Sequence, residues 1–161
     1  MVRPRYIICS EGRSIDRDTN LATYYNVIDA ITVSISAKDA NRPLAFGMTL
    51  CLSAVWMKDD PSEEDKEYES EIRLFSPNTE EPRVFPTPNF RFGEHYFHRI
   101  NLMLRPGMPV DEEVRSPTVD PIDFRDGLLR LECRIREVGG TTWHAQDYCI
   151  PIKVNRLGTA K

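Results

Sequence analysis

Four residues near the C-terminal end have the types and the spacing to form a binding surface. Arg130, Arg134 and Arg136 are separated by even numbers of positions, so on a β-strand their side chains share one face. Trp143 follows shortly after, beyond a pair of glycines. An exposed tryptophan beside arginines has the composition of hot spots in protein–protein interfaces. The ordinary outcome for such residues is a solvated face with surface salt bridges. The functional prediction is a binding site at these four residues.

An acidic run forms a second candidate site. It holds eight carboxylates, those of Asp59, Asp60, Glu63, Glu64, Asp65, Glu67, Glu69 and Glu71. Calcium needs about six to eight oxygen atoms converging on one point, and this spacing matches no defined calcium loop. A run of like charges is usually a solvated connection. We predict no metal site, and keep as the alternative function a small-ligand or metal-binding domain that uses the acidic loop 59–71 or the rim near His144.

The histidines form no site by their spacing. His95 and His98 point to opposite faces if they lie on one strand, so they cannot share a metal ion. His98 falls among apolar residues, where a hydrogen-bonded core histidine is the usual outcome. His144 lies near a hairpin tip and is the histidine whose protonation is most suited to a functional role.

The four cysteines are far apart, at positions 9, 51, 133 and 149, and contain no Cys-x-x-Cys pair. We predict reduced thiols that pack as small apolar side chains, with disulfides as the alternative. The sequence holds no Gly-x-Ser-x-Gly elbow, Walker loop or Gly-x-Gly-x-x-Gly run. We therefore predict a protein that is not an enzyme and carries no cofactor, although a Cys/His pair built from distant segments stays open.

Composition places the chain among globular proteins. Its 161 residues fit one domain, residues 1–161, with 40% hydrophobic residues and a net charge of −4. The acidic balance argues against a nucleic-acid partner. The first residues lack the long apolar stretch of a secretory signal, and no run approaches the roughly 20 apolar residues of a membrane span. We expect a cytoplasmic protein that does not bind membranes.

Alternating apolar and polar residues predict β-strands along most of the chain. In 44–58, one face carries Phe46, Met48, Leu50, Leu52, Ala54 and Trp56. In 95–105, one face carries Tyr96, His98, Ile100, Leu102 and Leu104. The predicted core consists of Leu50, Leu52, Trp56, Leu102, Leu104, Leu131, Tyr148 and Ile150. The segment 20–36 predicts two strands or one bent strand.

A hairpin is predicted at Gly139-Gly140, because both glycines reach positive φ freely. With a two-residue turn, Val138 faces Thr141. The inward pairs are then Leu129 with Ile150, Leu131 with Tyr148, Cys133 with Gln146 and Ile135 with His144. The outward pairs are Arg130 with Cys149, Glu132 with Asp147, Arg134 with Ala145 and Arg136 with Trp143. The opposed acids Glu132 and Asp147 are unfavourable unless arginines bridge them.

About seven or eight short strands with polar connections predict an all-β fold, an antiparallel β-sandwich of immunoglobulin-like or C2-like type. Residues Asp60-Pro61-Ser62-Glu63 predict one helical turn closed by a capping box, or else a solvated loop.

The two ends of the chain resemble a known family. Residues 6–9, 20–29 and 148–154, the last reading Tyr-Cys-Ile-Pro-Ile-Lys-Val, are similar to a family of uncharacterised bacterial proteins classed as a domain of unknown function. The resemblance implies a β-sandwich and a bacterial origin, and it transfers no functional residue. From all of these observations we expect an interaction module whose partner is another protein.

Overall fold

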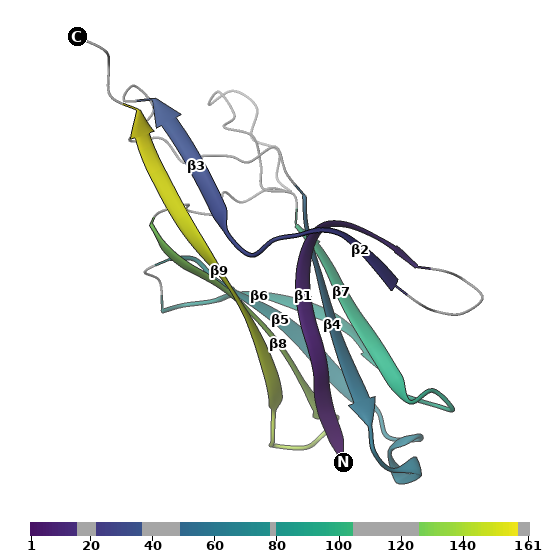
Figure 1. The fold of residues 1–161 in the computed structure, drawn as a ribbon. Coiled ribbons are helices and arrows are strands. Elements are labelled where there is room, and N and C mark those ends of the chain that lie inside the picture. The colour runs from purple at the N-terminus through teal and green to yellow at the C-terminus, as the bar shows by residue number, and fades with distance from the viewer. Residues whose placement is uncertain (16–21, 37–48, 78–79, 105–125, 158–161) are drawn as a thin grey trace, which may run out of the picture.

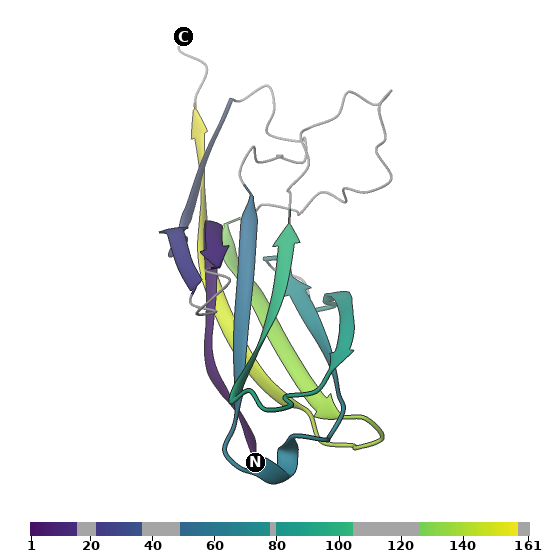
Figure 2. The same cartoon turned by 90° about the vertical axis from the view of Figure 1, so that its right-hand side faces the viewer.

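The computed structural model describes residues 1–15, 22–36, 49–77, 80–104 and 126–157. These residues form an all-β fold of nine strands in two sheets, which Figures 1 and 2 show from two sides. The strands are β1 (Val2–Ile15), β2 (Ala22–Val27), β3 (Ile31–Ser36), β4 (Leu50–Lys58), β5 (Tyr68–Phe75), β6 (Arg83–Phe90), β7 (Phe97–Leu104), β8 (Gly127–Glu137) and β9 (His144–Leu157). The described part of the chain thus has nine strands rather than seven or eight.

The two sheets are layered in a β-sandwich-like arrangement. The four-stranded sheet has the order β2-β1-β4-β7 and is antiparallel, and the five-stranded sheet has the order β3-β9-β8-β5-β6. The prediction of a two-sheet all-β fold is confirmed. The strand order does not clearly match an immunoglobulin-like or C2-like sandwich.

The prediction that both sheets are antiparallel is wrong for one pair of strands. β3 runs parallel to β9, with Ile31 opposite Ile152. Only residues 28–30 separate β2 from β3, yet these two strands belong to different sheets. The chain therefore crosses between sheets without a hairpin reversal. Segment 20–36 holds two strands rather than one bent strand, although residues 20 and 21 lie outside the described residues.

The core lies between the two sheets. Five of the predicted core residues are buried, namely Leu50, Leu52, Trp56, Leu131 and Ile150. Leu102, Leu104 and Tyr148 are only partly buried. The two leucines lie on β7, the last strand of its sheet, where fewer neighbours cover them. Tyr96, placed on the same face by its spacing, is 72% exposed because it precedes β7. The predictions for Phe46 and Met48 lie outside the described residues.

The hairpin register is confirmed, but its turn differs from the prediction. All predicted inward pairs from Leu129–Ile150 to Ile135–His144 are present. The tight turn lies one residue earlier than expected, with Val138 and Gly139 at its centre, because the Gly140 N–H donates to the Glu137 carbonyl at 2.8 Å. Of the two glycines, only Gly139 has a positive φ, at 81°. Val138 does not pair with Thr141; its N–H donates to the Glu67 carbonyl.

The predicted helical turn is a 3-10 helix, η2 (Pro61–Glu63). The Asp60 carboxylate caps it by accepting a hydrogen bond from the Ser62 N–H at 2.8 Å. The predicted capping box is wrong, because the buried Glu63 carboxylate accepts from the Tyr68 hydroxyl and lies 3.2 Å from Lys66 Nζ instead. The Tyr68 hydrogen bond is the main reason why the pKa of Glu63 is lowered.

Candidate functional site

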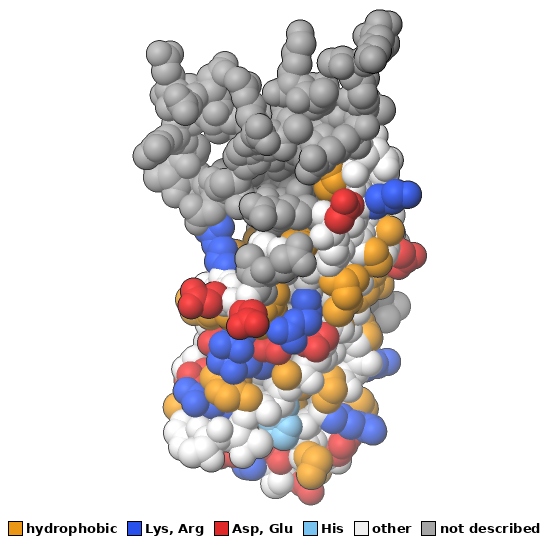
Figure 3. All heavy atoms as spheres, turned by 90° about the vertical axis from the view of Figure 1, so that its left-hand side faces the viewer, with side chains coloured by type: hydrophobic (Ala, Val, Ile, Leu, Met, Phe, Trp, Pro, Cys, Tyr) orange, Lys and Arg blue, Asp and Glu red, His pale blue; other side chains and the backbone are white. Residues whose placement is uncertain are grey.

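The predicted arginines lie on the outward side of β8, and Trp143 lies just before β9. Alternation sends Leu129, Leu131 and Cys133 into the core, so the residues between them face outward. Strand β5 lies beside β8 in antiparallel register and adds its own outward side chains. We call this surface the ladder face and define it by Glu69, Glu71, Arg73, Phe75, Arg130, Glu132, Arg134, Arg136, Trp143 and Asp147. Figure 3 shows acidic and basic side chains intermixed across the middle of this side of the molecule.

Oppositely charged residues face each other across the strands of the ladder face. The register pairs Glu69 with Arg136, Glu71 with Arg134 and Arg73 with Glu132. Such cross-strand pairs stabilise a sheet by about 0.2–1 kcal/mol each. The sequence missed this arrangement because the pairing of β5 with β8 is not fixed by any short turn between them.

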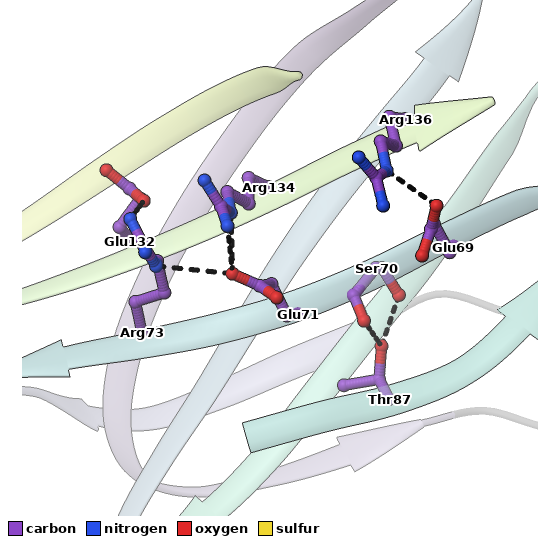
Figure 4. A network of polar contacts seen from close by, with 8 residues as sticks. All are labelled: Glu69, Ser70, Glu71, Arg73, Thr87, Glu132, Arg134 and Arg136. Carbon is purple, nitrogen blue, oxygen red and sulfur yellow. Dashed lines mark hydrogen bonds and ion pairs between the residues drawn. The ribbon is translucent and has the colours of Figure 1, made fainter. Parts of the chain in front are cut away.

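The contacts on the ladder face fix the arginine side chains (Figure 4). Nε and Nη2 of Arg134 both lie 2.6 Å from Oε1 of Glu71. Nε of Arg73 lies 3.2 Å from the same oxygen, and Nε of Arg136 lies 2.5 Å from Oε1 of Glu69. Each of these guanidinium groups is thus oriented by a carboxylate on a neighbouring strand or on its own strand.

Trp143 lies against two of these guanidinium groups. The Cζ atoms of Arg134 and Arg136 are 4.2 and 4.4 Å from the centre of its ring. The predicted contact between Arg136 and Trp143 is therefore present, and the contact with Arg134 is new. A cation at this distance from an indole is attracted by its π-electrons. The indole is half-buried rather than fully exposed.

Arg130 lies apart from this cluster. Its guanidinium packs on the Phe75 ring at 3.7 Å from the ring centre. Nη1 lies 3.8 Å from a carboxylate oxygen of both Glu132 and Asp147. Arg130 therefore bridges the like-charged pair, as the register required. The structure brings Arg134, Arg136 and Trp143 together and places Arg130 at a separate aromatic contact on the same face.

The charges on the ladder face are balanced. Its four arginines, Arg73, Arg130, Arg134 and Arg136, are matched by four acids, Glu69, Glu71, Glu132 and Asp147. These ion pairs are the ones expected of a solvated face with surface salt bridges. The ladder face is therefore a neutral surface of hydrogen-bond donors, acceptors and aromatic rings.

The carboxylates of the acidic loop are divided among separate partners. Asp59 pairs with Arg3 at 2.8 Å, Glu64 with Lys58 at 2.6 Å and Glu67 with Arg91 at 3.2 Å. Asp60 caps η2, and the last two acids of the run belong to the ladder face. Within the described residues, no group of three or more His, Cys, Asp or Glu side chains is placed to hold a metal ion.

The histidines have separate surroundings. His98 stacks on Phe90, with the ring centres 3.8 Å apart and the planes within 5°. Burial lowers the pKa of His98 to about 4. His95 is exposed, and His144 is half-buried opposite Ile135. The sequence placed His98 in apolar surroundings but did not identify its aromatic partner.

The four thiols are free. Cys9, Cys51 and Cys133 are buried, and Cys149 is exposed on β9 opposite Arg130. Burial raises the pKa of Cys9 and of Cys133 to about 12, so both thiols stay protonated at neutral pH. Three of the four therefore pack as the small apolar side chains that the sequence predicted.

No protein-family model matches this chain, and no curated protein matches it. The resemblance of its two ends to an uncharacterised bacterial family stays a prediction. Among the described residues, no helix has the length and apolar character needed to cross a membrane.

Proposed function

We propose that the chain is a non-enzymatic interaction module that binds another protein through the ladder face, with Trp143 at the centre of contact. The observation that carries this proposal is the stack of Arg134 and Arg136 on the Trp143 ring, at 4.2 and 4.4 Å. Tryptophan and arginine are the residue types most enriched in interface hot spots. In the same proposal the module works in the cytoplasm, where its free thiols stay reduced.

The order of the side chains supports this proposal. An arginine loses rotamer entropy when a partner immobilises it, at a cost of about 0.5–1.5 kcal/mol for each such side chain. Arg134 and Arg136 are already held by Glu71 and Glu69. The ladder face can therefore bind with a smaller entropic loss than a surface of free arginines.

The balance of charges indicates the kind of partner. Each guanidinium on the ladder face already has a carboxylate neighbour, so a strongly acidic surface would compete with those carboxylates. A partner with an apolar or aromatic group for the indole and a rim of mixed charge fits better. Such a partner is a folded protein surface or an extended segment of one.

Replacing Trp143 should remove the binding. The wild-type protein is first immobilised as bait to capture the partner. The Trp143→Ala variant should then bind that partner with a Kd raised by about thirtyfold or more, which corresponds to the loss of a hot spot of about 2 kcal/mol. Arg136→Glu should do the same, because it reverses a charge that contacts both the indole and Glu69. The measurement is quantitative capture followed by titration of the captured protein.

The matched control is Tyr25→Ala. Tyr25 is an aromatic residue on β2 of the other sheet and is 51% exposed, so its loss leaves the ladder face unchanged. Circular dichroism first establishes that all three variants keep the β fold. If both ladder-face variants bind the partner as tightly as the Tyr25 control, the ladder face is a stabilising surface and the proposal is wrong.

A further inference from the structure

The outer side of β4 is buried although it faces away from the core. Ser53 is 0% exposed and Cys51 is 3% exposed, and both alternate with the inward residues Leu52 and Ala54. β1 curves along its length (Figure 1), and its C-terminal half carries Arg13 to this side. Polar residues from β1, β2 and β7 therefore meet over β4.

Hydrogen bonds connect these residues into one cluster. Nη1 of Arg13 donates to Oγ of Ser53 at 3.0 Å, and Ser53 donates to Oδ1 of Asn101 at 2.9 Å. The hydroxyls of Tyr6 and Tyr24 lie 3.3 Å apart beside it. Burial and the hydrogen bond with Tyr6 raise the pKa of Tyr24, while the charge of nearby Arg99 acts in the opposite direction. The cluster thus combines guanidinium, phenol, hydroxyl and amide groups.

The contact of the Arg13 guanidinium differs in kind from those of four other arginines. Arg3, Arg91, Arg134 and Arg136 each contact a carboxylate. Within the part of the chain that the structure describes, the contact of the Arg13 guanidinium is with a neutral hydroxyl. The nearest acid along its strand, Glu11, accepts a hydrogen bond from Asn26 instead, at 2.7 Å. This half-buried guanidinium carries five N–H donors, a number and geometry that suit an oxyanion.

We propose that Arg13, Tyr6, Tyr24 and Asn101 form a second binding site, which takes a small oxyanion of the phosphate class, free or as a monoester. A guanidinium presents paired N–H donors that match the oxygens of a phosphate group. Nη1 of Arg13 already donates a hydrogen bond to Ser53, and this bond orients the guanidinium plane and its other N–H donors. The phenol hydroxyls and the amide nitrogen of Asn101 supply further donors. This site lies on the four-stranded sheet and is independent of the ladder face.

The test is calorimetric titration of the whole chain with inorganic phosphate, at constant ionic strength set with chloride. We expect saturable binding, and at least about a tenfold loss of affinity in Arg13→Gln, the loss expected when a charge-assisted contact is removed. Arg91→Gln is the control, because Arg91 is 61% exposed and paired with Glu67. Phenyl phosphate distinguishes the two sources: tighter binding than inorganic phosphate indicates a monoester, and equal binding indicates the free anion.

Further variants guard against a change in folding. Tyr24→Phe removes only one hydroxyl, and Arg13→Lys keeps the charge without the paired donors. Both substitutions should lower the affinity for phosphate severalfold, while the circular dichroism spectrum stays unchanged. The proposal is overturned if phosphate shows no saturable heat in the wild-type protein. It is equally overturned if Arg13→Gln and Tyr24→Phe bind phosphate as the wild type does.

Discussion

Replacing Leu131 with alanine is expected to lower the free energy of unfolding by about 2–5 kcal/mol. Leu131 is 0% exposed on β8, the strand that pairs with both β5 and β9. Its side chain belongs to the cluster between the two sheets, so alanine leaves a cavity that neighbouring strands cannot easily close. Urea unfolding followed by tryptophan fluorescence measures the loss.

Leu128→Ala is the matched control for this substitution. Leu128 lies on the same strand but is 56% exposed, so removing its side chain should change the free energy of unfolding by less than about 0.5 kcal/mol. Similar losses in the two variants would contradict the assignment of inward and outward faces on β8. That assignment also places the arginines of the ladder face.

Acidification should destabilise the protein through His98. Burial against Phe90 lowers the pKa of His98 from 6.5 to about 4. The folded protein therefore keeps His98 neutral while the unfolded chain binds a proton. The stability associated with the neutral ring is complete above pH 6.5 and is lost as the pH falls from there toward 4. The full loss is roughly 3 kcal/mol by linkage.

The measurement compares wild type with His98→Gln at several pH values between about 7.5 and 4.5. The wild-type protein should lose more stability than the variant over this range, because glutamine has no proton to bind. His95→Gln is the control, since His95 is exposed and its replacement should leave the pH dependence unchanged. Parallel curves for wild type and His98→Gln would mean that the ring accepts a proton in the folded state.

The C-terminal hairpin was predicted well because two local signals agree. The apolar alternation of β8 and that of β9 select the same register from Leu129–Ile150 to Ile135–His144. The turn was predicted less well, because a glycine pair permits several loops and the spacing alone does not select among them. The bond from Val138 to Glu67, a residue far away in sequence, helps to fix the loop that forms.

Contacts between distant strands account for most of what the sequence did not predict. The parallel pairing of β3 with β9 joins residues more than a hundred positions apart, and no turn residue indicates it. Ser53 on the outer side of β4 is buried and contacts Arg13 of β1 and Asn101 of β7, which period-two alternation does not encode.

The sequence predicts only part of the candidate site, because the rest depends on contacts between distant strands. The predicted hairpin pairs Arg136 with Trp143. The structure shows their side chains in contact, although the strand pairing itself ends at Ile135–His144. Glu69 and Glu71, the partners on β5, belong to the acidic run in the sequence, and no local signal pairs them with β8. Their pairing with β8 makes the ladder face a neutral surface.

An exchange of charges between Glu69 and Arg136 tests most directly whether the ladder face binds or only stabilises. The double variant Glu69→Arg, Arg136→Glu keeps an opposite pair across β5 and β8, so its free energy of unfolding should stay within about 1 kcal/mol of the wild type. It also takes the guanidinium of Arg136 away from Trp143. We predict that this stable variant no longer binds the partner captured by the wild type, and undiminished binding by the exchanged variant would contradict the account.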